Sequence, residues 1–185
     1  MNAPISGRVK SAQAGTLTFM TGMSASKSVE ITKEIVWSCL YRMGTRIFEC
    51  GGPGSGAVAK LCNNMALASQ MAGICEAMHL GTTLGMNAQI LSNVIQASTG
   101  SCWSNGVNNP HPDVGPMAKN DYNEGFASKL MLKDLMLAVQ ASEQANVYVP
   151  TTLHVKGMYE HVSLKQDMAV KDFGILMQFL KEQEK

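Results

Sequence analysis

Residues 50–65, CGGPGSGAVAKLCNNM, mark the point at which the character of the sequence changes. Pro53 punctuates the chain here, because proline tends to end helices and strands. Residues 54–85 then run without a proline and hold many alanines and methionines. This composition predicts one helix of many turns that is buried on most sides. We therefore expect residues 1–52 and residues 53–185 to form two different domains.

Upstream of Pro53 the sequence predicts mixed α and β structure. Residues 15–22, GTLTFMTG, are rich in strand-forming side chains and are bounded by glycines, which predicts a strand. Residues 27–44 place Val29, Val36 and Leu40 at helical spacing, and Gly44 is a plausible end of that helix. Residues 45–52, TRIFECGG, predict a second short strand. Since two strands and one helix cannot close a stable sheet, residues 1–52 resemble the end of a larger α/β domain.

Downstream of Pro53 every predicted element is a helix. Further helices are expected at residues 88–97, at residues 127–146, from Pro150 onward, and at residues 170–181. Residues 98–116 are rich in Asn, Gly and Pro and predict a long irregular segment. Irregular segments of this length are uncommon in compact domains and tend to be functional or disordered. The sequence thus predicts a mainly α protein with a small α/β part at its start.

The overall composition excludes several classes of partner. Of the 185 residues, 45% are hydrophobic but only 16% are charged, which indicates buried surface beyond one small domain, such as a subunit interface. The net charge is +1 with no basic stripe, which argues against nucleic acid and against a membrane surface as partners. No run approaches the length of a membrane span, and no targeting segment is visible in MNAPISGRVK.

The cysteines and histidines do not form a metal-binding pattern. The five cysteines have irregular spacing without a C-x-x-C pair, and the four histidines add no ligand spacing. We therefore expect no metal site and no disulfide framework, but buried free thiols in a reducing compartment.

Lys60 and Asn64 are the first candidate site residues. Four residues apart on the predicted helix, they share a face. Gly54 and Gly56 would let a ligand or another backbone approach the start of this helix. In a partly dry cleft, the pKa of a lysine is lowered, which suits proton exchange with an alcohol, and Asn64 could hold a hydroxyl. On spacing alone, a lysine pointing into solvent remains the simpler interpretation.

Ser6 and Gly7 are a second candidate, because a turn led by proline can present a hydroxyl and backbone N–H groups to a carboxylate. Composition alone favours an ordinary turn over such a site. Lys133 and Asp134 are the only charges in the apolar stretch LMLKDLMLA, so they form either a structural pair or part of a site.

Two large aromatic residues are candidates for the wall of a pocket. Trp103 lies in the long irregular segment, and Phe126 lies just before a predicted helix. Either residue could equally anchor the hydrophobic core, as large aromatic side chains usually do.

Six segments carry a resemblance to a known family: NAPISG, GTLTFM, CGGPGSGAVAKLCNNM, EAMHLG, STGSCWS and GFASKLMLKDLMLA. Together and in this order they resemble the C-terminal two-thirds of the β-hydroxyacid dehydrogenases, over essentially the whole chain. The G-x-G-x-x-x-K-x-x-x-N block is the most specific of them. The CWS loop favours the 3-hydroxyisobutyrate dehydrogenase branch over the tartronate semialdehyde and 6-phosphogluconate branches. The resemblance implies a remnant of a Rossmann-type NAD-binding domain, residues 1–52 with the substrate loop. An all-helical substrate and dimerisation domain like that of 6-phosphogluconate dehydrogenase would follow at residues 53–185.

The resemblance also implies a reaction and a set of roles. Lys60 would take the proton from the primary alcohol of 3-hydroxyisobutyrate while hydride passes to NAD, and Asn64 would orient the substrate. The product would be methylmalonate semialdehyde, an intermediate of valine breakdown. The other implied roles are carboxylate binding by Ser6 and Gly7, pocket walls from Trp103 and Phe126, and a place near the cofactor for Lys133. Homo-oligomers are implied, in the mitochondrial matrix of eukaryotes or the cytoplasm of bacteria.

The chain departs from the family pattern at several points. It lacks the G-x-G-x-x-G motif that follows the first strand of the nucleotide-binding domain, so we expect an N-terminally truncated chain. Asn2, Arg8 and Ser101 stand where the family usually has aspartate, glycine and arginine. Without the pyrophosphate site at a helix N-terminus, we expect this chain alone to bind NAD very weakly or not at all. The alternative is a non-catalytic helical module that pairs with full-length subunits.

Overall fold

The computed structural model describes residues 1–7, 9–24 and 27–183 of the chain. Contacts within the chain divide it into two compact units, Met1–Asn63 and Asn64–Lys185, which we call the N-unit and the C-unit. The domain boundary expected from the sequence, at residues 52–53, remains a prediction.

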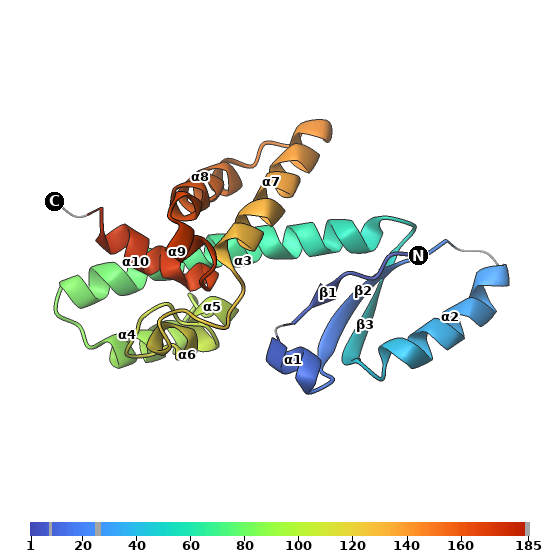
Figure 1. Ribbon diagram of the computed structural model, residues 1–185, viewed down its shortest axis with the longest axis horizontal. Coiled ribbons are helices and arrows are strands. Elements are labelled where there is room, and N and C mark those ends of the chain that lie inside the picture. Colours follow the sequence, from blue (N-terminus) through green and yellow to red (C-terminus); the bar gives the residue numbers. More distant parts are fainter. Residues whose placement is uncertain (8, 25–26, 184–185) are drawn as a thin grey trace. The chain divides into compact units, whose positions relative to one another are not determined.

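The N-unit is a small sheet with two helices (Figure 1). Along the chain it holds β1 (Ile5–Ser6), α1 (Val9–Gln13), β2 (Leu17–Gly22), α2 (Lys27–Leu40) and β3 (Gly44–Gly51). β2 is the central strand, antiparallel to β1 and parallel to β3. The buried side chains of Leu17, Phe19 and Leu40 form a hydrophobic cluster between the sheet and α2.

Both strands predicted for this part are confirmed, but the predicted end of the helix is wrong. α2 ends at Leu40, and Gly44 is instead the first residue of β3. A Cβ atom at Gly44 would lie 2.2 Å from the carbonyl oxygen of Leu17, so glycine is needed here for two strands to approach. The short elements β1 and α1 were not predicted.

The first turn of α3 (Ser55–Thr83) packs directly on the backbone of the sheet. Gly56 is buried, and a Cβ atom added to it would lie 2.1 Å from the carbonyl oxygen of Met20 in β2. The glycine therefore serves a close approach of helix to strand within the N-unit.

We expect Gly56→Ala to lower the free energy of unfolding of the N-unit by about 2 kcal/mol or more, because the backbone of β2 cannot move aside. The chain has two tryptophans, and Trp37 lies in the N-unit, so a Trp103→Phe background reports this unit by fluorescence during urea unfolding. Gly73→Ala is the matched control in the same helix, since nothing lies within 4 Å of its added Cβ. That control, read through Trp103 in a Trp37→Phe background, is expected to stabilise the C-unit by up to about 1 kcal/mol. Equal effects of the two substitutions would contradict the packing described here.

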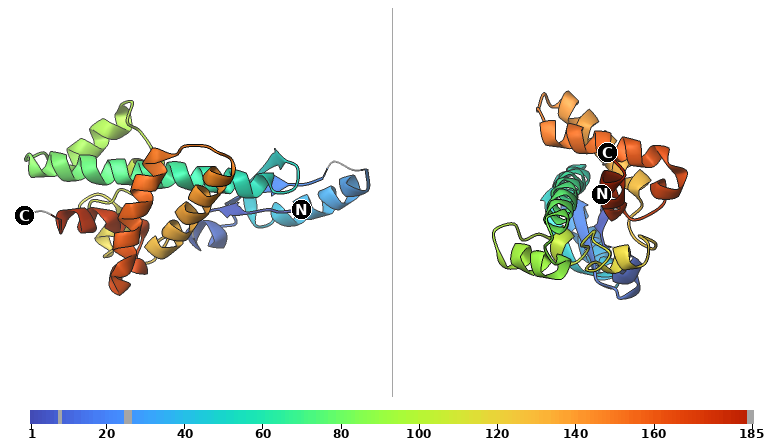
Figure 2. Two further views of the ribbon diagram at one scale, coloured as in Figure 1. Left: turned by 90° about the horizontal axis from the view of Figure 1, so that it is seen from above. Right: turned by 90° about the vertical axis from the view of Figure 1, so that its left-hand side faces the viewer.

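The C-unit is entirely helical in the part that the structure describes. α3 continues into it from the N-unit, and α4 (Ala88–Ala97), α7 (Ser128–Gln144) and α8 (Pro150–Leu164) are its other long helices. The short elements are α5 (Trp103–Gly106), α6 (Pro116–Lys119), α9 (Gln166–Ala169), the 3₁₀ helix η1 (Phe173–Ile175) and α10 (Leu176–Lys181). Figures 1 and 2 show them gathered around the C-terminal part of α3. The predicted mainly α fold is confirmed, with one small mixed sheet.

The core of the C-unit is rich in methionine. Met71, Met78, Met131 and Met177 have no exposed surface and pack with the equally buried Tyr159. The expected burial of the long helix is confirmed along its core-facing side, where Met71, Cys75 and Met78 have no exposed surface, but one side remains exposed. Leu80 is 62% exposed and Val58 60% exposed, so apolar side chains of α3 face solvent on one side.

The other predicted helices of the C-unit agree closely with the structure. α4 covers residues 88–97 as predicted, α7 lies within the predicted range, and Pro150 is the first residue of α8. The last predicted helix starts too early, because residues 171–172 pair with residues 127–128 in an extended arrangement before η1 begins.

The irregular segment at residues 98–116 is present and contains only the short helix α5 and the first residue of α6. It is not loosely packed: Asn105, Asn108 and Asn109 are at most 2% exposed. Their side-chain amides make hydrogen bonds here, where helix and strand hydrogen bonds are few. Asn109 Nδ2, for example, donates to Asn105 Oδ1 at 2.9 Å.

The five cysteines are free, but the expectation that they are buried is wrong for Cys39 and Cys62 and holds only in part for the half-buried Cys50 and Cys102. Cys75 alone is fully buried, and burial raises the pKa of its thiol. Cys39 and Cys62 are exposed.

None of the helices in the described part of the chain combines the length and apolar character that crossing a membrane requires.

Candidate functional site

The residues that the sequence singles out divide between the two units. Ser6, Gly7 and Lys60 belong to the N-unit, whereas Asn64, Trp103, Phe126 and Lys133 belong to the C-unit. The roles assigned to these residues remain predictions.

In the N-unit, Ser6 ends the short strand β1 and pairs with Thr18 of β2. Gly7 follows with a φ of +149°, and a Cβ atom there would lie 2.6 Å from Leu17 Cδ2. The backbone angle thus favours glycine, and the end of the Leu17 side chain fills the space beside it. Packing fixes the turn after β1, and Gly7 carries no side chain that would cover its backbone. Arg8 lies outside the described residues.

Lys60 lies in the second turn of α3 and is half-buried. Asn64 lies one turn later on the same helix and is 2% exposed. The predicted helical spacing of four residues is therefore present.

The glycines before α3 do not form a phosphate-binding loop. The N–H of Gly54 donates to the side-chain oxygen of Asn2 (3.3 Å), and Gly56 lies against the backbone of β2. A pyrophosphate needs free N–H groups at a helix N-terminus that follows a strand of a larger parallel sheet. The residues described here do not fit that requirement, so no step of a reaction is assigned to a dinucleotide held by this turn.

In the C-unit, Asn64 and Asp134 join α3 to α7. Asn64 Nδ2 donates to Asp134 Oδ2 at 2.5 Å, and Asp134 Oδ1 lies 2.7 Å from Lys133 Nζ. The side chain of Asp134 is 11% exposed, whereas that of Lys133 is 60% exposed. Lys133 and Asp134 thus form the ion pair that was one of the two interpretations of the apolar stretch. The contact between Asp134 and Asn64 was not predicted, although a single acid in an apolar helix indicates a buried partner.

The two candidate aromatic residues differ in their surroundings. Phe126 is half-buried, and its ring meets Phe173 edge to face with 6.2 Å between the centroids. Trp103 is the first residue of α5 and is 39% exposed, so it is not a buried core anchor.

Asp172 was not predicted to matter, yet it organises the backbone around Phe126. Its side chain is 1% exposed and accepts from Asn108 Nδ2 (2.8 Å), from the N–H of Phe126 (2.9 Å) and from the N–H of Gly174 (3.0 Å). The bond from Gly174 caps η1. Aspartate two residues before glycine, at the start of a helical stretch, is the sequence feature that could have revealed this cap.

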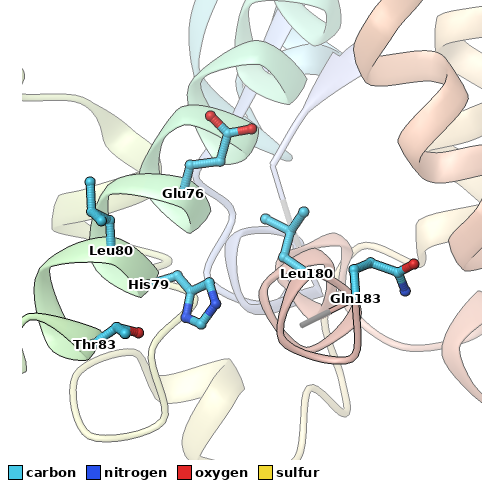
Figure 3. Close-up of a pocket in the computed structure, with 6 residues that line it drawn as sticks. All are labelled: Glu76, His79, Leu80, Thr83, Leu180 and Gln183. Atoms are coloured by element: carbon cyan, nitrogen blue, oxygen red, sulfur yellow. The ribbon is translucent and has the colours of Figure 1, made fainter. Parts of the chain in front are cut away.

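A pocket of about 330 Å³ lies elsewhere in the C-unit (Figure 3). Glu76, His79, Leu80 and Thr83 of α3 line one side of it, and Leu180 and Gln183 line the other. None of the predicted site residues contributes to this pocket. Among the residues that the structure describes, no cluster of three or more His, Cys, Asp or Glu side chains could hold a metal ion.

Comparison with known proteins defines the class of protein to which this helical fold belongs. Residues 54–180 match the family described as NAD-binding of NADP-dependent 3-hydroxyisobutyrate dehydrogenase. The chain belongs to this family, so the resemblance drawn from the sequence is confirmed.

Individual relatives agree with this assignment. The chain is 41% identical to the probable mitochondrial 3-hydroxyisobutyrate dehydrogenase of Arabidopsis thaliana over 94% of its length, and 38% identical to the human mitochondrial enzyme over all of it. It is 39% identical to the NAD-dependent L-serine dehydrogenase of Pseudomonas aeruginosa over 95% of its length. The structure of the Mycobacterium tuberculosis 3-hydroxyisobutyrate dehydrogenase with L-serine superposes with a TM-score of 0.87 at 39% identity, over 97% of this chain.

The chain spans about half the length of the curated relatives it matches: 49% of the Arabidopsis protein, 54% of the human protein and 58% of the Pseudomonas protein. It covers 60% of the Mycobacterium chain. The matched region is the C-terminal part of these proteins.

Proposed function

We propose that this chain provides the substrate-handling part of an NAD-dependent dehydrogenase that oxidises 3-hydroxyisobutyrate to methylmalonate semialdehyde. The observation that carries the proposal is the placement of Lys60 and Asn64 one turn apart on α3, in a chain of this family. Relatives that are 38–41% identical bear the name of this enzyme, which supports the choice of substrate.

The chemistry assigned to the chain is proton transfer and substrate orientation. As the O–H bond of the primary alcohol breaks, the neutral amine of Lys60 takes the proton. A bound nicotinamide would supply the other half of the chemistry, acceptance of the hydride from the carbon that bears the hydroxyl. Asn64 holds the hydroxyl by hydrogen bonding. The turn before α3 does not suit a pyrophosphate, so its residues have no part in anchoring the cofactor in this proposal.

The remaining residues are assigned to the rest of the small substrate and to the cofactor. Ser6 and the N–H groups around Gly7 bind the carboxylate, which the glycine turn after β1 supports because it leaves the backbone accessible. Trp103 and Phe126 form apolar walls beside the methyl group. Lys133 lies near the cofactor, and its 60% exposed side chain supports a contact with a second molecule.

A non-catalytic module that pairs with other subunits is the second candidate, and exposed apolar side chains favour it. Leu80, Leu84 and Tyr148 are 62%, 75% and 81% exposed. A homo-oligomer is part of the first proposal as well, so the two candidates differ in one respect. Only the dehydrogenase requires the amine of Lys60.

The substrate can be tested with a chimaera in which the nucleotide-binding domain of the Mycobacterium relative precedes this chain. We expect kcat/KM for 3-hydroxyisobutyrate to exceed that for L-serine by about tenfold or more, because serine places an ammonium where the substrate has a methyl group. L-serine is the matched competitor, since one relative is named for it and another binds it. A preference for serine would refute the substrate but leave the dehydrogenase class standing.

A further inference from the structure

Residues 109–115 form a closed loop within the irregular segment of the C-unit. The two ends of the loop touch, because a Cβ atom at Gly115 would lie 1.6 Å from the carbonyl oxygen of Asn109. The N–H of His111 donates to Asn109 Oδ1 at 2.9 Å. Its carbonyl oxygen accepts from the N–H groups of Val114 (3.0 Å) and Gly115 (2.9 Å). The backbone of His111 is therefore fixed from both sides.

The imidazole of His111 takes part in the loop as a hydrogen-bond acceptor. The N–H of Asp113 donates to His111 Nδ1 at 3.2 Å, and His111 is 8% exposed. A ring nitrogen accepts only when it carries no proton, so this contact requires the neutral imidazole with its hydrogen on Nε2. A proton added to Nδ1 would set two hydrogens against each other. The hydrogen bond from Asp113 and the charged imidazole thus exclude each other.

Burial and neighbouring charges decide where the ring takes a proton. Burial, and then the positive charge of Lys181 on α10, lower the pKa of His111 from its ordinary value of 6.5. The carboxylate of Asp113 opposes them, since its Oδ2 lies 3.8 Å from Nδ1. That side chain is 80% exposed, so solvent weakens its attraction. The closed loop therefore holds the neutral ring at neutral pH.

We propose that His111 is a pH-sensitive latch, which keeps residues 109–115 closed while the imidazole is neutral and releases the N–H of Asp113 once the imidazole is charged. This inference goes beyond the proposed function and does not depend on it. The loop also anchors its surroundings, because the carbonyl oxygen of Pro110 accepts from the buried hydroxyl of Tyr122 at 2.7 Å. Opening therefore weakens the hold of the loop on the rest of the C-unit.

The direction of the pH dependence follows from proton binding. A solvated histidine in the open loop binds a proton more readily than the ring in the closed loop, so protons favour opening. As the pH falls below 6.5, the equilibrium constant for opening rises by up to about tenfold for each pH unit, until the closed form is protonated as well.

The first measurement follows the wild-type chain of 185 residues by NMR. At neutral pH we expect His111 Nδ1 to be the ring nitrogen without a proton, and the amide of Asp113 to be protected from hydrogen exchange. Its protection factor, which corrects for the intrinsic pH dependence of exchange, should fall by about fivefold or more between about pH 7.5 and about pH 5. A protection factor that stays constant over this range would overturn the latch.

His111→Asn is the matched variant that cannot titrate, because an asparagine oxygen also accepts from the N–H two residues further on. It should keep the amide of Asp113 protected over the whole range. His154→Gln removes an exposed histidine of α8 and should leave the pH dependence of the wild type unchanged. A loss of protection in acid that persists in His111→Asn would assign it to another group and overturn the inference.

Two charge variants test the same latch with His111 in place. Lys181→Gln should raise the pH at which His111 is half protonated, and Asp113→Asn should lower it. Because the loss of protection grows with the difference between the open and closed forms in proton affinity, it should shrink in Lys181→Gln and grow in Asp113→Asn. The reverse order of the two variants would contradict the proposal.

Discussion

Asp172→Ala is expected to lower the free energy of unfolding of the C-unit by about 3–5 kcal/mol. The substitution leaves three donors without the carboxylate that accepts from them: the buried Asn108 Nδ2 and N–H of Gly174, and the partly buried N–H of Phe126. Domains of this size are stable by only about 5–15 kcal/mol, so the loss removes a large part of the total. Urea unfolding followed by Trp103 fluorescence in a Trp37→Phe background measures it. Asp167→Ala, at an exposed position of α9, is the control and should change little.

Gly125 supplies a second test of the same contact. A Cβ atom at this position would lie 1.9 Å from Asp172 Oδ2, so Gly125→Ala displaces the carboxylate from its donors. Because Asp172→Ala removes the obstructing oxygen, the double variant should lose much less stability than the sum of the two single variants. Simple additivity would mean that the two residues act independently and would contradict the geometry described here.

Local sequence rules predicted the regular elements of this fold well. Pro53 lies between β3 and α3, and Pro150 opens α8, because a proline tolerates only a few backbone positions. The run 15–22 contains β2, because strand-forming side chains bounded by glycines favour a strand. The ends of elements were missed where tertiary contacts decide them. Gly44 resembles a helix stop, but the backbone of Leu17 makes it a strand residue.

The candidate site could be predicted only in part, because much of it depends on contacts distant in sequence. The helical spacing of Lys60 and Asn64 is local and was predicted, and the pairing of Lys133 with its neighbour was one of two interpretations of the sequence. The bond between Asn64 and Asp134 joins residues 70 positions apart, and no periodicity reveals it. The buried asparagines of residues 98–116 were hidden for the same reason, since their composition alone resembles that of a solvated loop.

Lys60→Ala is expected to produce the largest effect on activity. In the chimaera with the nucleotide-binding domain of the Mycobacterium relative, oxidation of 3-hydroxyisobutyrate should slow by about 10²–10⁴-fold, the contribution of a positioned general base. The loss should fall on kcat more than on KM, because the proton is transferred only in the transition state. Lys119→Ala, at an exposed lysine of α6, is the matched control and should leave the rate unchanged.

The most direct test of this account is NADH formation from 3-hydroxyisobutyrate by the chimaera and its Lys60→Ala variant, with and without added ethylamine. We predict turnover by the chimaera, its loss in the variant, and partial recovery when the free amine replaces the missing side chain. The chain of 185 residues alone should give no NADH. A variant that retains turnover within about fivefold of the parent chimaera, far from the loss expected for a general base, would contradict the assignment of Lys60.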